Sequence, residues 1–183
     1  MPIRRQWVTC WAAAILLVSA PATAQRSDSS EAPVKAAFLY NFTKFVEWPD
    51  AAFAEPSAPF VVCVFADAAF RKELEAILHN EQVRGRQITI APASLEDPRG
   101  CHIAYFGQGE AAQGRMLDAV KRLPVLTVGE GRRFLEQGGQ IAFLVENDRV
   151  RFAISRRAVE AARLTISSKL LRVARDFDGR TEP

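Results

Sequence analysis

The chain has 183 residues, with 24 lysines and arginines against 21 aspartates and glutamates. This near balance lacks the basic surplus of a general nucleic-acid-binding protein, so we expect no nucleic-acid partner. The length suits one domain with a proper hydrophobic core, and no segment after residue 24 is apolar for long enough to form a transmembrane helix.

The N-terminus has the pattern of a secretory signal peptide. Arginines at positions 4 and 5 precede an apolar run over 11–20, and an Ala-x-Ala cleavage site follows at 22–24. The run is too short for a stable membrane span, although an uncleaved anchor is the alternative. We expect residues 1–24 to be removed and the mature protein to be exported, without direct membrane insertion.

Residues 25–33 are polar and end in proline, which predicts a flexible mature N-terminus. The segment FLYNFTKFVEWP (38–49) then concentrates aromatic residues and stops at Pro49. Its apolar residues recur at helical spacing, so a helix is expected from residue 34 to Trp48, the residue that the proline restricts. The predicted buried side consists of Val34, Phe38, Phe42, Phe45 and Val46. The predicted polar side consists of Lys35, Asn41, Lys44 and Glu47.

Three further residues of this helix, Leu39, Tyr40 and Trp48, lie at the margins of the predicted apolar side. Tyrosine and tryptophan are enriched at interface hot spots because they combine a large apolar area with a polar group. We therefore predict that these residues form a partner or self-association surface. The alternative is that all five aromatic residues of the segment belong to the core.

Downstream, β-rich apolar runs alternate with helical segments. Two β-rich runs about a turn at Asn147-Asp148 predict a hairpin over 140–154. The pattern indicates one α/β layered domain over residues 34–175, followed by a polar tail over 176–183. Its sheet is expected to be mixed and mainly parallel, with an antiparallel C-terminal hairpin and helices on both faces. The other predicted strands are 60–66, 86–91, 101–107 and 124–129, and the other predicted helices are 69–78, 111–123, 131–138, 155–164 and 166–175.

Removal of the signal peptide leaves two cysteines, Cys63 and Cys101. An even number of cysteines in an oxidising compartment favours a disulfide, which here would close a long loop. The alternative is a buried thiol at Cys63, because its apolar strand is a place where cysteine acts as a small hydrophobic residue.

The search for catalytic groups is largely negative. His79 ends a helical segment and suits a solvated or capping residue, whereas His102 adjoins Cys101. Neighbouring residues on a strand point to opposite faces, so these two cannot form a Cys–His dyad. The sequence has no nucleophile elbow, Walker loop or zinc-protease motif, and we expect no catalytic residue, metal site or cofactor.

Two glycine-rich turns each follow a predicted strand and open a helical segment: Gly107-Gln108-Gly109 and Gly129-Glu130-Gly131. In a parallel sheet they lie at the carboxyl ends of the strands, where ligands of open α/β folds bind, and Arg132 is close in sequence. Neither turn completes a Gly-x-Gly-x-x-Gly motif, so tight-turn glycines are the alternative interpretation. These loops are the candidate small-ligand site.

Together with the export signal, three segments resemble the YfiR-like family of periplasmic proteins: VKAAFLYNFTKFVEWP (34–49), GGQIAFLVENDRVRFAI (138–154) and LTISSKLLRVA (164–174). The resemblance implies a periplasmic, non-catalytic homodimer that binds the periplasmic sensor domain of an inner-membrane GGDEF diguanylate cyclase. Holding that cyclase inactive would limit cyclic di-GMP signalling and biofilm formation. The alternative function is a periplasmic small-ligand-binding protein or co-receptor.

The resemblance also concerns the cysteines. Cys63 and Cys101 match the positions of one family disulfide, and repression by the namesake depends on oxidised cysteines. Namesake-like members carry a second cysteine pair in the C-terminal hairpin, whereas the segment QIAFLVENDRVRF here has none. The sequence therefore lacks the second cysteine pair that a redox mechanism with two disulfides requires.

Overall fold

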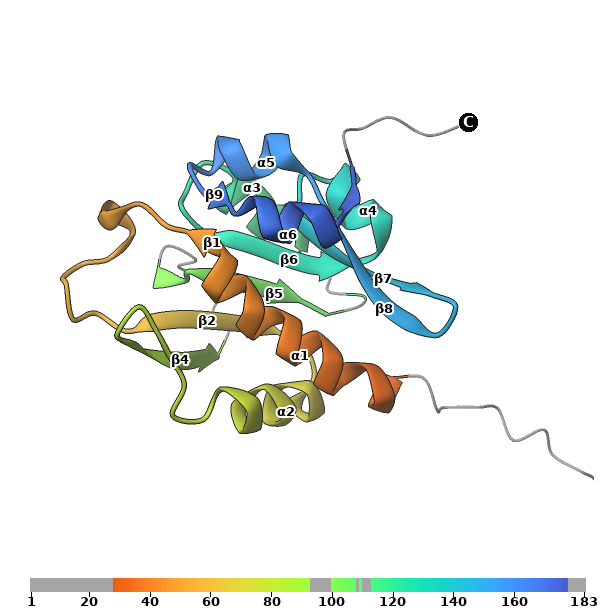
Figure 1. Cartoon of the computed structure of the whole chain (residues 1–183), viewed down its shortest axis with the longest axis horizontal. Helices are drawn as coiled ribbons and strands as arrows, with labels where there is room; N and C mark the ends of the chain where they lie inside the picture. Colours follow the sequence, from red (N-terminus) through yellow and green to blue (C-terminus); the bar gives the residue numbers. More distant parts are fainter. Residues whose placement is uncertain (1–27, 93–99, 108, 110–112, 178–183) are drawn as a thin grey trace, which may run out of the picture.

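The domain is a mainly parallel β-sheet with helices on both faces (Figure 1), as the sequence predicts. The structure is a computed structural model that describes residues 28–92, 100–107, 109 and 113–177. The predicted signal peptide and most of the predicted polar tail lie outside these residues. Within the described ranges, no helix combines the length and apolar character needed to cross a membrane.

The helices and strands follow in chain order. The helices are α1 (Asp28–Phe45), α2 (Ala68–Leu78), α3 (Gln113–Val120), α4 (Gly131–Glu136), α5 (Arg156–Ala161) and α6 (Ser168–Val173), with a 3-10 turn, η1 (Asp50–Ala52). The strands are β1 (Val46–Glu47), β2 (Phe60–Phe65), β3 (Gln82–Val83), β4 (Arg86–Pro92), β5 (Ile103–Phe106), β6 (Leu126–Glu130), β7 (Ile141–Glu146), β8 (Arg149–Ile154), β9 (Thr165–Ile166) and β10 (Arg175–Asp176).

The described residues form one large sheet with the strand order β10-β8-β7-β6-β5-β2-β4-β3. Strands β4, β2, β5, β6 and β7 pair in parallel, and β8 pairs with β7 antiparallel. The chain leaves β2 towards β4 and then returns to β5 on the other side, so the order reverses between β2 and β5. Doubly wound flavodoxin-like sheets have the same reversal, and their ligands bind at the carboxyl ends of the strands there.

The hairpin between β7 and β8 is confirmed with the predicted turn. Asn147 and Asp148 have φ values of 50° and 57°, the left-handed geometry that a two-residue type I′ turn requires at both positions. The resulting register pairs Phe143 with Phe152 and Val145 with Val150. This places the two phenylalanines together on the sheet face that α1 covers.

Helix α1 packs its aromatic side against this hairpin. The Phe42 ring is fully buried, and its centroid lies 6.0 Å from that of Phe143 and 5.2 Å from that of Phe152. Half-buried Phe38 makes an edge contact with Phe152 at 5.3 Å. The helix also packs against α2, so its buried face is wider than a single stripe.

The predicted flexible segment over 25–33 is wrong from Asp28 onward, because α1 begins there. Pro33 lies inside the helix, just beyond its first turn, where its missing N–H removes one helical hydrogen bond. The Glu31 carboxylate lies 2.9 Å from the Lys35 ammonium one turn later, and this pair stabilises the additional turns.

The buried face of α1 is also rotated relative to the prediction. Leu39 and Trp48 are only 1% and 8% exposed, so their predicted position at the margin is wrong. Lys35, predicted on the polar side, is buried, whereas Val34 is 42% exposed. The reason is that α1 packs against both the sheet and α2, and the Glu130 carboxylate at the end of β6 forms an ion pair with Lys35. Of the predicted surface residues, only Tyr40 is half-buried rather than buried.

We expect Phe42→Ala to lower the free energy of unfolding by about 3–5 kcal/mol, because it removes a fully buried ring and leaves a cavity between α1 and the hairpin. Denaturant unfolding followed by circular dichroism measures the change. Val34→Ala on the exposed side of the same helix is the control, with an expected change within about 0.5 kcal/mol. Equal effects of the two substitutions would contradict the packing described.

Candidate functional site

The disulfide between Cys63 and Cys101 is present and joins the two strands at which the sheet order reverses. Cys63 lies in β2 and Cys101 lies two residues before the start of β5, with 5.7 Å between their Cα atoms. Both cysteines are buried among the side chains on the α3–α4 face of the sheet. The bond therefore fixes the start of β5 against the middle of β2.

His102 lies on the other side of the strand from Cys101, as predicted, and is buried between two phenylalanine rings. The imidazole stacks on Phe53 at 4.5 Å and on Phe60 at 4.9 Å, and its Nδ1 accepts a hydrogen bond from the Val61 N–H at 3.0 Å. Burial lowers the pKa of His102 to about 4, helped by the charge of Arg86 and opposed by the carbonyl of Ala52. His102 is thus a neutral ring and a hydrogen-bond acceptor at neutral pH.

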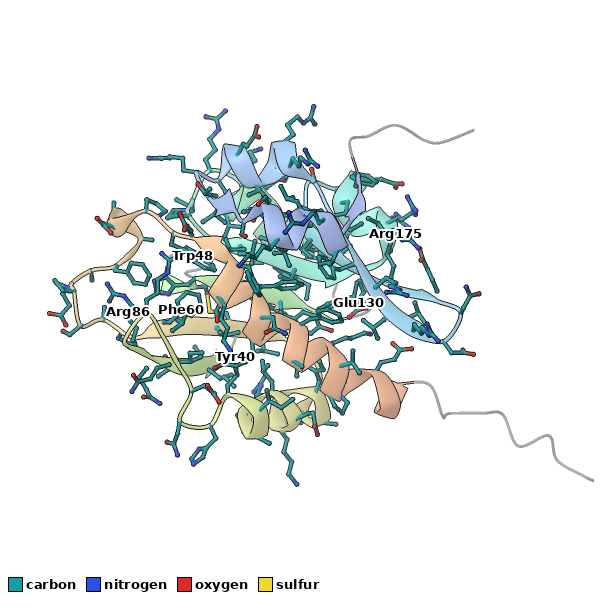
Figure 2. All side chains as sticks on the ribbon, in the orientation of Figure 1. Tyr40, Trp48, Phe60, Arg86, Glu130 and Arg175 are labelled. Carbon is teal, nitrogen blue, oxygen red and sulfur yellow. A yellow bond between two sulfur atoms is a disulfide. The ribbon has the colours of Figure 1, made fainter. Side chains whose placement is uncertain are left out.

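The stack continues beyond His102 at both ends and holds the loop over 49–59 on the sheet. The Arg86 guanidinium lies 3.8 Å over the Phe53 ring and donates hydrogen bonds to the carbonyls of Glu55 and Ala58. At the other end Trp48 meets Phe60 edge-on at 4.8 Å, and its indole N–H donates to the His102 carbonyl. Figure 2 shows Trp48, Phe60 and Arg86 gathered at this end of the domain.

A buried ion network lies at the carboxyl ends of β5 and β6. The Lys35 ammonium lies 2.9 Å from the Glu31 carboxylate and 3.0 Å from the Glu130 carboxylate. The Tyr105 hydroxyl donates a 2.5 Å hydrogen bond to the other oxygen of Glu130. The side chains of Lys35 and Glu130 are only 9% and 10% exposed (Glu130 is labelled in Figure 2). Each charge in the network therefore has a direct partner.

The environment shifts the pKa values of three members of this network. Burial raises the pKa of Glu130, against the opposing effects of the Tyr105 hydroxyl and Lys35. Burial lowers the pKa of Lys35, but the Glu31 and Glu130 carboxylates outweigh it and the net shift is upward. Burial and the Glu130 charge raise the pKa of Tyr105. At neutral pH Lys35 is therefore charged and Tyr105 protonated, and the network acts as a structural connection between α1 and the sheet.

The predicted ligand loops lie at the carboxyl ends of adjacent strands, but two of their glycines, Gly107 and Gly129, are in close packing contacts. A Cβ at Gly129 would meet the Phe134 ring at 2.4 Å, and one at Gly107 would meet the Ala66 Cβ at 3.1 Å. Gly109 and Gly131 have φ values of 75° and 74°, which favour glycine. Arg132 is exposed on α4. The space beside Gly129 is filled by the Phe134 ring and the space beside Gly107 by Ala66, which leaves no need for a ligand to explain these glycines. This packing supports the tight-turn interpretation.

Sequence reasoning missed the ion network, although two signals for it were present. Glu31 and Lys35 are one helical turn apart, the spacing of a favourable ion pair. Glu130 lies between the two glycines at the carboxyl end of a buried strand, a place where an acidic side chain is unusual unless it has a partner. His79 is exposed at the end of α2, as expected.

In the described part of the chain, no three or more His, Cys, Asp and Glu side chains are grouped so that they could hold a metal ion. The two histidines lie in separate environments, since His79 is exposed and His102 is enclosed by aromatic rings.

The model of the YfiR/HmsC-like family matches residues 32–175. Among solved structures, the chain is similar to a conserved domain protein from Vibrio cholerae O1 biovar eltor strain N16961, with a TM-score of 0.54 and 11% identity. The match covers 77% of this chain and 59% of that one, so the chain spans less than two thirds of that protein's length. At this identity the likeness concerns the fold alone. No curated protein matches the sequence.

We expect the double variant Cys63→Ala/Cys101→Ala to lower the free energy of unfolding by about 2–5 kcal/mol, the usual effect of removing a native disulfide from a small secreted domain. Chemical unfolding without reductant measures it. Thiol titration of the unfolded, unreduced wild type is the control and should find almost no free thiol. Two free thiols per chain, or equal stability of both proteins, would contradict the bond.

The network also predicts a pH dependence on the alkaline side. The folded-state pKa values of Tyr105 and Lys35 lie above their ordinary values of 10.0 and 10.5, so the unfolded chain loses these protons first. Their stabilising contribution is complete below about pH 9 and falls as the pH rises beyond about 10. We expect Tyr105→Phe to make this decline shallower, as measured by unfolding at a series of pH values. Identical alkaline slopes would contradict the assignment.

Proposed function

The chain belongs to the YfiR/HmsC-like family, and from this premise we propose that it is a periplasmic, non-catalytic repressor of an inner-membrane diguanylate cyclase. In this proposal a homodimer binds the periplasmic sensor domain of the cyclase and keeps its cytoplasmic GGDEF domain inactive. The consequence is a lower level of cyclic di-GMP and less biofilm. The repressor itself carries out no reaction.

The observation that carries the proposal is the extent of the family match. It runs from residue 32 to residue 175, which takes in almost all of α1 and every later helix together with all strands up to the start of β10. The charged groups at the strand ends support a non-catalytic role, since Lys35, Glu130 and Tyr105 are engaged with one another. An acid or base poised for catalysis would instead need access to a substrate.

A repressor of this kind acts through differential binding. Shifting a two-state sensor from almost fully active to almost fully inactive requires about 10⁴-fold tighter binding to the inactive state. A rigid domain loses little conformational entropy on binding, which favours such a difference. The disulfide between β2 and β5 and the stack around His102 both restrict local motion and so contribute to this rigidity.

Tyr40 is the residue of the predicted contact surface that keeps solvent access, and we retain it as a proposed partner or self-association contact. Its ring lies under the Lys44 ammonium at 3.7 Å, and its hydroxyl donates to the Glu81 carboxylate. These contacts hold the half-buried ring in one orientation between α1 and the start of β3.

Deleting the gene is expected to raise cellular cyclic di-GMP only in cells that retain the membrane cyclase, because the cyclase makes the product. Mass spectrometry of nucleotide extracts from four strains, with each gene deleted singly and together, measures this. Purified protein should neither make nor degrade cyclic di-GMP. An equal rise in the strain that lacks the cyclase would overturn the proposal, as would turnover by the purified protein.

A further inference from the structure

The charges of the domain are unevenly distributed along the chain. Between Arg156 and Arg172 there are five basic residues and one acidic residue, Glu160. Residues 46–82 have the opposite character, with seven acidic and two basic residues. The acidic residues of this second segment are spread over the domain: Glu47 lies in β1, which pairs with β9 between α5 and α6, whereas α2 lies at the other end of the domain (Figure 1). The basic residues are therefore concentrated on α5, α6 and the link between them.

The basic residues of the α5–α6 end share one surface. Both helices lie on the same face of the sheet, where Val159 of α5 and Leu170 of α6 belong to one buried cluster. The opposite sides of these helices, and Arg163 in the link between them, are exposed. We call the exposed basic side chains on this surface the basic face: Arg157, Arg163, Lys169 and Arg172.

The basic face is not neutralised by its neighbours. No salt bridge involves any of its four side chains within the part of the chain that the structure describes. The ion pair nearest to it in sequence is between Arg175 and Glu146, on β10 and β7. A cluster of exposed like charges raises the local positive potential and attracts an anionic partner.

We propose that the basic face adsorbs to the anionic phospholipid surface of the membrane. Residues 155–174 contain no aromatic residue, whereas protein–protein hot spots are enriched in tryptophan and tyrosine and interface cores are depleted of lysine. A spread of lysine and arginine side chains is instead what anionic headgroups attract. Val173, which is 68% exposed beside Arg172, adds an apolar contact at the headgroup level.

Adsorption through this face also orients the domain. Because the exposed basic side chains are on α5, α6 and the link between them, the molecule lies with α5 and α6 towards the lipid and α2 away from it. The inference rests on the proposed function only in that the cyclase partner resides in this membrane. It requires no insertion into the hydrocarbon region.

Sedimentation with vesicles tests the proposal on the mature protein. Vesicles with about one third phosphatidylglycerol in phosphatidylcholine should bind it at about 50 mM salt and release it at about 500 mM salt, whereas pure phosphatidylcholine should not bind it. The triple variant Arg157→Gln/Lys169→Gln/Arg172→Gln should bind about a hundredfold more weakly, since each basic residue contributes about fivefold.

The matched control removes the same charge from the opposite face of the sheet. Arg122→Gln/Arg132→Gln/Arg133→Gln changes three exposed arginines after α3 and on α4, and it should bind phosphatidylglycerol vesicles as the wild type does. Equal losses in the two variants would show that net charge alone matters and would overturn the proposal, as would no binding at low salt. The assay contains no cyclase, so its failure leaves the repressor proposal intact, and failure of repression leaves the lipid result intact.

Discussion

The contact between α1 and the β7–β8 hairpin is the interaction on which the rest of the domain depends. Phe42 packs on Phe143 and Phe152, and the chain then leaves the helix directly into β1, which pairs with β9. The Ser167 N–H bonds to the Phe45 carbonyl and fixes the start of α6 to the end of α1. The segments 34–49, 138–154 and 164–174, which resemble the family, therefore form one packed unit. The family signature is foremost a description of how this unit is held together.

The ion network determines where α1 lies on that unit. A buried charge without a partner is costly, and a buried pair often adds little net stability but makes alternative arrangements unfavourable. A shift of α1 by one turn would separate Lys35 from Glu130 and leave the buried Glu130 carboxylate without its cationic partner, with only the Tyr105 hydroxyl bound to it. The aromatic contacts alone are less selective, because apolar surfaces can slide past one another at a smaller cost. The rings thus supply most of the attraction, and the charges specify the register.

Features that depend on local sequence were predictable, and features that depend on distant partners were not. The hairpin turn is encoded by Asn147-Asp148 themselves, and the disulfide follows from the number of cysteines and the compartment. The rotation of α1 depends on Glu130, a residue far along the chain, so helical periodicity assigned Lys35 to the wrong side. Gly129 illustrates the same limit, since only the folded chain shows that Phe134 occupies the space beside it.

Confinement to a surface changes what a weak interaction can achieve. A repressor free in the periplasm must supply all of its binding energy through contacts with the cyclase, including the entropy lost on association. A repressor held at the same membrane, even transiently, meets the cyclase at a higher effective concentration and in a restricted set of orientations. The proposed adsorption through the basic face on α5 and α6 provides that situation. Under the proposed function, the contact with the cyclase then needs to be selective for the inactive sensor but not tight, because localisation and discrimination are supplied by different surfaces.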